Sequence, residues 1–232
     1  MKQKIRLPFF ETSVKNYIYG DAVLEYAKCA DAAAREYDID ILFVAPYADI
    51  RRVSENTTHL IVLAPYMDAI YPGRGMADVL PESLKAAGAQ GVVINHSERP
   101  MSLSAIRKTI ERADELDLLT FVCADTISEA QALAHFHPDI LNPEPTELIG
   151  SGQVSDIAYV KEVVRAVKAI DPSIYVEQAA GITTAQQVYD FIMAGSEAAG
   201  AASGILRSAD PFALLNEMVR YVRKAKDELS KK

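Results

Sequence analysis

The clearest indication of the fold comes from residues 91–123, which read GVVINHSERPMSLSAIRKTIERADELDLLTFVC. The β-branched and aromatic runs GVVI and LTFVC at its two ends predict strands. Between them, residues 102–116 begin with a serine that can cap a helix and carry apolar side chains at helical spacing. A strand, a helix and a second strand in this order form a right-handed crossover between parallel strands. The stretch therefore predicts an α/β protein with a parallel sheet.

The same alternation continues on both sides of this stretch. We expect strands at residues 5–10, 39–45, 59–64, 91–94, 119–123, 139–142, 174–177 and 198–203. We expect helices at residues 21–37, with Asp21 as N-cap, and at 81–88, 102–116, 128–135, 155–170, 184–194 and 210–229. Strand–helix units of this number in 232 residues fit a (β/α)8 TIM barrel that forms one domain over residues 1–232. An open doubly wound sheet is the alternative.

The composition excludes several classes of protein. The net charge is −8, whereas a nucleic-acid-binding protein presents a clustered basic face, so no nucleic acid is expected as a partner. The two cysteines, Cys29 and Cys123, form neither a disulfide framework nor a zinc motif, which favours a reducing compartment. No apolar run approaches the length that spans a bilayer, and residues 1–7 lack a signal-peptide core. We therefore expect a cytoplasmic protein without a membrane partner.

Two motifs carry polar residues at the C-terminal ends of predicted strands, where ligands bind in such folds. Residues 95–98, Asn-His-Ser-Glu, place His96 where it can polarise a carbonyl or move a proton. Glu144 stands between Pro143 and Pro145, which suits a base that must hold its position. A histidine that caps the next segment and an ordinary loop acid are the alternative interpretations.

Three further loops suit an anionic ligand. Residues 146–152 have an apolar middle and end in Gly-Ser-Gly, which is compatible with a loop that closes over a ligand. Residues 179–183 and 202–204 are small, so their backbone N–H groups can approach a phosphate. The alternatives are a plain turn before the helix at Ser155 and close helix–strand packing. His135 and His137 lack a nearby third ligand, so no metal is expected.

Taken together, these motifs resemble the triosephosphate isomerase family, in particular its short archaeal form. Residues 95–98 are similar to the family's (G/N)HSE signature, and residues 144–152 to its EPxxxIGTG segment. Residues 79–82, Val-Leu-Pro-Glu, and 180–183, Ala-Gly-Ile-Thr, also match the short form. The resemblance covers nearly the whole chain.

The resemblance implies a role for each of four side chains. Glu144 would move a proton between adjacent carbons, and His96 would polarise the carbonyl as a neutral imidazole. Lys15 would neutralise the substrate phosphate and the developing oxyanion, with Ser13 where the family has asparagine. Glu98 would orient Lys15.

The resemblance also implies how the substrate is held. The phosphate would bind to the backbone N–H groups of Gly150, Gly181, Ala202 and Ser203. The closing lid would consist of Pro145, Thr146, Glu147, Leu148, Ile149, Gly150, Ser151 and Gly152. The partner would be a small phosphorylated sugar, and no metal or organic cofactor is required. A homodimer or homotetramer is implied, with residues 73–76 as the contact.

The sequence departs from the family at several positions. A different alignment would place Ile18 where the family has its lysine and would remove the cation. Ala179 replaces a glycine, Pro65 replaces a glutamine, and Met76 replaces the threonine at the tip of the interface loop.

Three functions follow as hypotheses. The first is interconversion of dihydroxyacetone phosphate and glyceraldehyde 3-phosphate through an enediolate. The second is the same chemistry on a related phosphorylated ketose, such as a tetrulose phosphate, which the changes at Pro65 and Ala179 suggest. The third is a non-catalytic barrel that binds a phosphometabolite, which follows from the alignment with Ile18.

Overall fold

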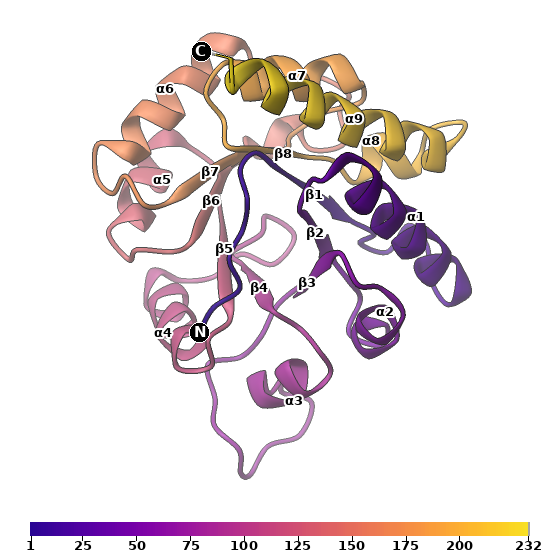
Figure 1. The fold of residues 1–232 in the computed structure, drawn as a ribbon. Helices are drawn as coiled ribbons and strands as arrows, with labels where there is room; N and C mark the ends of the chain where they lie inside the picture. The colour runs from indigo at the N-terminus through magenta and orange to yellow at the C-terminus, as the bar shows by residue number, and fades with distance from the viewer. Residues whose placement is uncertain (232) are drawn as a thin grey trace.

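The computed structural model describes residues 1–231 and shows a closed barrel of parallel strands surrounded by helices (Figure 1). The strands pair in chain order, and β1 closes the ring against β8. They are β1 (Phe9–Ser13), β2 (Ile41–Val44), β3 (Leu60–Ala64), β4 (Gly91–Ile94), β5 (Leu119–Ala124), β6 (Ile140–Pro143), β7 (Tyr175–Gln178) and β8 (Ala198–Gly200). The prediction of a (β/α)8 barrel is confirmed, and the open sheet is wrong.

The helices cover the outside of the barrel (Figure 1). They are α1 (Asp21–Tyr37), α2 (Ile50–Asn56), α3 (Pro81–Ala86), α4 (Leu103–Glu115), α5 (Ile127–Ala134), α6 (Ile157–Lys168), α7 (Ala185–Met193), α8 (Ser203–Leu206) and α9 (Pro211–Leu229). A 3-10 turn, Thr146–Leu148, follows β6. None of the helices in residues 1–231 combines the length and the apolar character that crossing a membrane demands.

Several predicted boundaries are wrong. β1 begins at Phe9 rather than at residue 5, because Pro8 has no N–H to donate to the sheet. Gly20, in a left-handed conformation with φ of 63°, is the N-cap of α1, and Asp21 is the first helical residue. The predicted strand 198–203 ends at Gly200, and Ser203 instead begins α8.

The core has two layers because successive strand residues point to opposite faces. One layer lies between the strands and the helices. The other fills the inside of the barrel and consists of Ile5, Phe9, Leu42, Val44, Ile61, Leu63, Val93, Leu119, Phe121, Cys123, Ile140 and Ala198. Full burial of each large side chain contributes about 1.5–3 kcal/mol. The polar residues Glu11, Asn142 and Glu177 are also buried on these strands, and Glu11 and Asn142 line a cavity.

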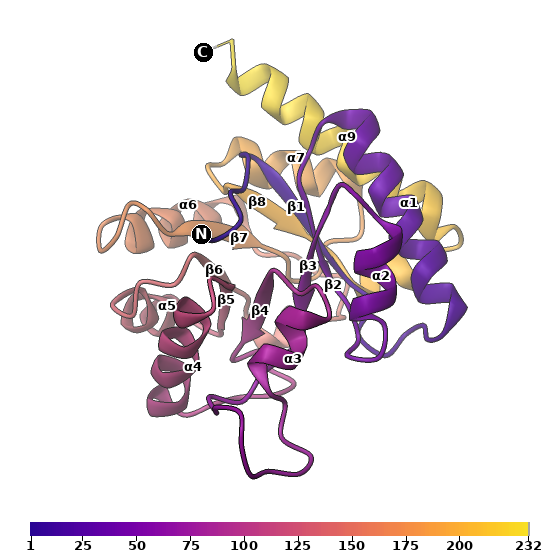
Figure 2. The ribbon, with the colours of Figure 1, turned by 60° about the horizontal axis from the view of Figure 1, so that its bottom comes forward.

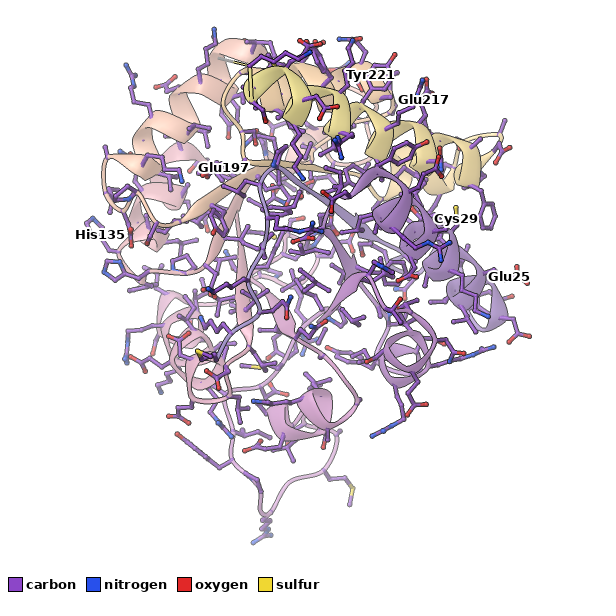
Figure 3. The ribbon with its side chains drawn as sticks, in the orientation of Figure 1. Glu25, Cys29, His135, Glu197, Glu217 and Tyr221 are labelled. Atoms are coloured by element: carbon purple, nitrogen blue, oxygen red, sulfur yellow. The ribbon has the colours of Figure 1, made fainter. Side chains whose placement is uncertain are left out.

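Helices α1 and α9 pack side by side where the first and last parts of the chain meet (Figure 1). Tyr26 on α1 contacts Phe212 on α9, with ring centroids 6.2 Å apart, and its hydroxyl lies 2.8 Å from Thr12 Oγ1 on β1. Cys29, labelled in Figure 3, lies on the same helix, with its Sγ 3.8 Å from the Phe212 carbonyl oxygen. The contact of Tyr26 with Thr12 thus joins this helix pair to β1.

Residues 65–80, between β3 and α3, form a long loop that extends away from the barrel. Both views show this projection (Figures 1 and 2). Tyr71 and Met76 are exposed in this loop, Met76 to 93%. Large apolar side chains in such a position favour a protein partner.

Candidate active site

A cavity of about 350 Å³ opens at the C-terminal ends of the strands. Strand ends or following loops from all eight strands line it. Small-molecule sites commonly have this size and position in such barrels. All four side chains proposed from the sequence, Lys15, His96, Glu98 and Glu144, line this one cavity.

Glu144 is held directly after β6. Its N–H donates to the carbonyl oxygen of Ala124 at 2.7 Å, and a proline lies on each side of it. The carboxyl Oε2 lies 4.0 Å from His96 Nε2, and the Glu144 side chain is only 11% exposed. Burial raises the pKa of Glu144 to about 7. A carboxyl with such a pKa can take up and release a proton near neutral pH.

His96 follows a sharp turn after β4. Asn95 makes this turn with a left-handed φ of 60°, and its amide bridges the carbonyl oxygen of Cys123 and the N–H of Met101. The N–H of Glu98 donates to His96 Nδ1 at 3.1 Å. Because Nδ1 accepts this bond, the ring proton lies on Nε2, which is the nitrogen nearer Glu144.

The His96 ring is neutral at physiological pH. Burial, followed by the positive charge of Lys15, lowers the pKa of His96 to about 4. The side chain is therefore an uncharged hydrogen-bond donor in the cavity, suited to a carbonyl oxygen.

Lys15 reaches the cavity from the end of β1. Its Nζ lies 3.1 Å from Glu98 Oε1, and its N–H donates to Ser13 Oγ at 3.2 Å. The side chain is 18% exposed, so its charge acts in a partly desolvated site. Ile18 instead packs against the hydrophobic core and does not line the cavity.

The four residues expected to bind a phosphate line the same cavity. They are Gly150, Gly181, Ala202 and Ser203. The N–H groups of the first three donate no hydrogen bond within residues 1–231. Gly181 has a left-handed φ of 72°, and a Cβ there would lie 1.7 Å from the carbonyl oxygen of Gln153, so the position requires glycine.

The expected lid forms a compact turn after Glu144. The N–H of Thr146 donates to Asp125 Oδ1 at 2.7 Å, and the Ser151 hydroxyl donates to the carbonyl oxygen of Leu148 at 2.8 Å. Ile149 and Gly150 line the cavity. The other expected lid residues lie outside its lining: Pro145, Thr146, Glu147, Leu148, Ser151 and Gly152.

Sequence reasoning missed several residues of the cavity. Glu11 lines it from β1. Arg99 and Tyr66 also line it, and the Arg99 guanidinium lies over the Tyr66 ring, 4.0 Å from the ring centroid. Glu177, which lies outside the cavity lining, is fully buried on β7 close to Glu11. Glutamates are rarely buried, so a glutamate inside an apolar strand sequence is unusual. The positions of Glu11 and Glu177 in such strands could have indicated them from the sequence. No group of three or more histidine, cysteine or acidic residues within residues 1–231 is arranged to hold a metal ion.

Known proteins are similar to this chain over nearly its whole length. The family model described as triosephosphate isomerase matches residues 12–187. The triosephosphate isomerase of Methanobacterium bryantii is 36% identical over 220 residues, which are 93% of this chain and 97% of the relative. That of Methanothermus fervidus is 34% identical, over 86% of this chain and 91% of the relative.

A solved structure shows the same fold. It is the crystal structure of triosephosphate isomerase from Bartonella henselae, which aligns with a TM-score of 0.77 at 17% sequence identity. The alignment covers 94% of this chain and all of that chain. The family model and the curated relatives place the chain among the intramolecular aldose–ketose isomerases. More particularly, the chain belongs to the triosephosphate isomerase family.

Proposed function

We propose that the chain interconverts dihydroxyacetone phosphate and glyceraldehyde 3-phosphate. The observation that carries this proposal is the pairing of the Glu144 carboxyl with the neutral His96 ring, 4.0 Å apart in one cavity. Glu144 removes a proton from the carbon next to the substrate carbonyl, and His96 Nε2–H hydrogen-bonds the carbonyl oxygen. His96 passes its Nε2 proton to the former carbonyl oxygen and takes up the proton of the neighbouring hydroxyl, which becomes the new carbonyl. Glu144 returns its proton to the carbon that carried the original carbonyl. The relatives' printed names agree with this reaction.

The remaining groups stabilise charge in the reaction. Lys15 balances the negative charge of the enediolate oxygen and the phosphate, and its contact with Glu98 orients the ammonium group. The unpaired N–H groups of Gly150, Gly181 and Ala202, together with Ser203 at the start of α8, receive the phosphate oxygens. Residues 145–152 close over the substrate and exclude water.

The alternatives receive less support. Relatives named for the triose reaction, rather than for a tetrulose phosphate, are similar to nearly the whole chain. The non-catalytic hypothesis depends on Ile18 at the position of the cation. Ile18 is partly buried against the core, whereas Lys15 lines the cavity.

The test is a coupled isomerase assay with glyceraldehyde 3-phosphate on the wild type and on Glu144→Gln. We expect wild-type turnover and a loss of 10²–10⁴-fold in the variant, because the amide cannot accept the proton. Glu162→Gln, an exposed change on α6, is the matched control and should retain activity. Absence of wild-type turnover would contradict the proposed reaction, and normal turnover of Glu144→Gln would contradict the proposed base.

We also propose that the chain acts in the cytoplasm as a homodimer or homotetramer. Both cysteines are free, which suits a reducing compartment. The exposed apolar side chains of the loop 65–80 support an assembly in which this loop contacts a second copy.

A further inference from the structure

Two carboxyl groups lie buried beside one another inside the barrel. Glu11 on β1 is 7% exposed and Glu177 on β7 is fully buried, and the short strand β8 lies between their strands. A Cβ at Gly200 on β8 would lie 2.6 Å from Glu11 Oε2 and 2.4 Å from Glu177 Oε1. These two carboxyl oxygens therefore lie within 5.0 Å of each other. The absence of a side chain at Gly200 is what makes room for them.

Neither carboxyl accepts a hydrogen bond within residues 1–231. Both oxygens of Glu177 are buried without a hydrogen bond, and residues 1–231 donate none to the Glu11 carboxyl. Asn142, 3% exposed and lining the cavity, also has an Oδ1 without a donor. Burying two ionised carboxylates in this way is costly, and neighbouring carboxyls relieve the cost by holding protons.

The surroundings of Glu11 favour its protonated form. Burial and the negative charge of Glu144 raise the pKa of Glu11 to about 8, although Lys15 acts in the opposite direction. Burial and the charge of Glu11 raise the pKa of Glu177 well above its usual value. The titratable groups that face Glu11 are Lys15 beyond β1, Tyr26 on α1, Cys123 on β5, Glu144 beyond β6 and Glu177 on β7.

We propose that Glu11 is a substrate-binding acid, whose protonated carboxyl donates a hydrogen bond to a hydroxyl or carbonyl oxygen of the bound sugar phosphate. This inference rests on the proposed function, because it places the oxygen in the cavity that Glu144 and His96 share. Glu177 faces Glu11 with a second buried carboxyl, which supplies no positive charge on that side to stabilise an ionised Glu11. A neutral acid also leaves the cavity able to receive an anionic substrate.

Two substitutions test whether Glu11 acts as a hydrogen-bond donor or as a charged carboxylate. Glu11→Gln keeps the size of the side chain and an N–H donor, so kcat/KM at pH 7 should stay within about threefold of the wild type. Glu11→Leu has no donor, so kcat/KM should fall about tenfold or more, the effect of one lost hydrogen bond. If Glu11→Gln is as impaired as Glu11→Leu, Glu11 acts as a carboxylate and the inference is wrong. It is also wrong if neither change has an effect.

The pH profile gives a readout that a merely structural role would not change. In the wild type, kcat/KM should rise as pH increases to about 7, because Glu144 must lose its proton to act as a base. It should fall again above about 8, because Glu11 loses the proton that it donates. Glu11→Gln should lack this fall. Retention of the same alkaline fall would overturn the inference.

An infrared measurement tests protonation without turnover. The wild type minus Glu11→Gln difference spectrum should contain a carboxylic-acid carbonyl band at pH 6.5, and this band should disappear by pH 10. The control is Glu197→Gln, whose native carboxyl at the opposite end of the barrel pairs with Lys168 at 2.7 Å (Figure 3). The wild type minus Glu197→Gln difference spectrum should lack the band. If the band is absent, the inference is wrong, even if the enzyme is active. If the band is present but the wild type is inactive, only the proposed function is wrong.

Discussion

Lys15 occupies a backbone conformation that its residue type rarely adopts. Its φ is 43°, in the left-handed region, where a residue with a Cβ is disfavoured by about 1–2 kcal/mol. The hydrogen bond from its N–H to Ser13 Oγ and the contact of its Nζ with Glu98 hold this conformation. Strain of this kind persists where neighbouring contacts enforce it, often at functional sites. The turn directs the ammonium group into the cavity.

Substitution of Lys15 by methionine tests the proposed cation. The change keeps much of the side-chain length but removes the charge, so we expect kcat/KM to fall about 10²–10³-fold. Circular dichroism should show an unchanged fold. Lys161→Met, an exposed change on α6, serves as the control. Activity of Lys15→Met within a few-fold of the wild type would show that another group stabilises the negative charge.

Glu98 contacts both His96 and Lys15. Its backbone N–H fixes the tautomer of His96, while its carboxylate contacts Lys15. One residue thus sets both the position of the ring proton and the position of the cation. Its side chain is 63% exposed, so the ion pair itself contributes little to stability.

At the scale of secondary structure, the small residues of β8 leave space inside the barrel for side chains of the neighbouring strands. Its residues Ala198 and Gly200 are small, so the neighbouring strands β7 and β1 can direct larger side chains inward. The carboxyl groups of Glu177 and Glu11 take that space. A larger residue at Gly200 must displace them.

Gly200→Ala should therefore destabilise the protein. The new methyl group overlaps two buried carboxyl groups, so the free energy of unfolding should fall by about 1–3 kcal/mol in urea titrations. Combining it with Glu177→Ala removes one overlap, and the double variant should lose less stability than the two single losses together. Strictly additive losses would show that Gly200 and Glu177 do not contact each other.

The sequence was sufficient to predict the alternation of elements but not all of their ends. Strands buried on both faces read as apolar runs, and this pattern located β4 at residues 91–94. Helix α2 was missed because it buries only Ile50 and Val53, too few positions to show a period. Helix α8 was missed because its four residues are shorter than a detectable repeat.

Only those site residues that stand in a recognisable sequence motif could be predicted. His96 and Glu144 stand in motifs at strand ends, and the structure brings them together. Glu11 and Glu177 are 166 positions apart in the sequence, and no local pattern relates them. Their proximity arises only when β1 and β7 both pair with β8.

At the scale of the whole molecule, the loop 65–80 projects from the barrel (Figure 2). Asp68 holds its base, because its carboxylate accepts hydrogen bonds from the Tyr66 hydroxyl at 2.6 Å and from the N–H of Val79 at 2.7 Å. The tip carries the exposed Met76. A loop with a fixed base and an apolar tip is suited to insertion into a second copy.

Met76→Asp tests this assembly. In sedimentation equilibrium, the wild type should have a mass that is a multiple of 25.4 kDa. The variant should dissociate at concentrations at which the wild type does not, because a charge is buried at the contact. Leu229→Asp, a similar change at the end of α9, is the control and should behave as the wild type. A wild type that sediments at 25.4 kDa would contradict the proposed assembly.

Closure of the barrel between β1 and β8 has a consequence for synthesis on the ribosome. Phe9 pairs with Ala198, so the first strand to emerge waits for the last before its second edge is covered. Until then the nascent chain exposes unpaired backbone groups on β1 and β7, a state that invites association between chains. The contact between α1 and α9 forms later still, because α9 follows β8 in the chain.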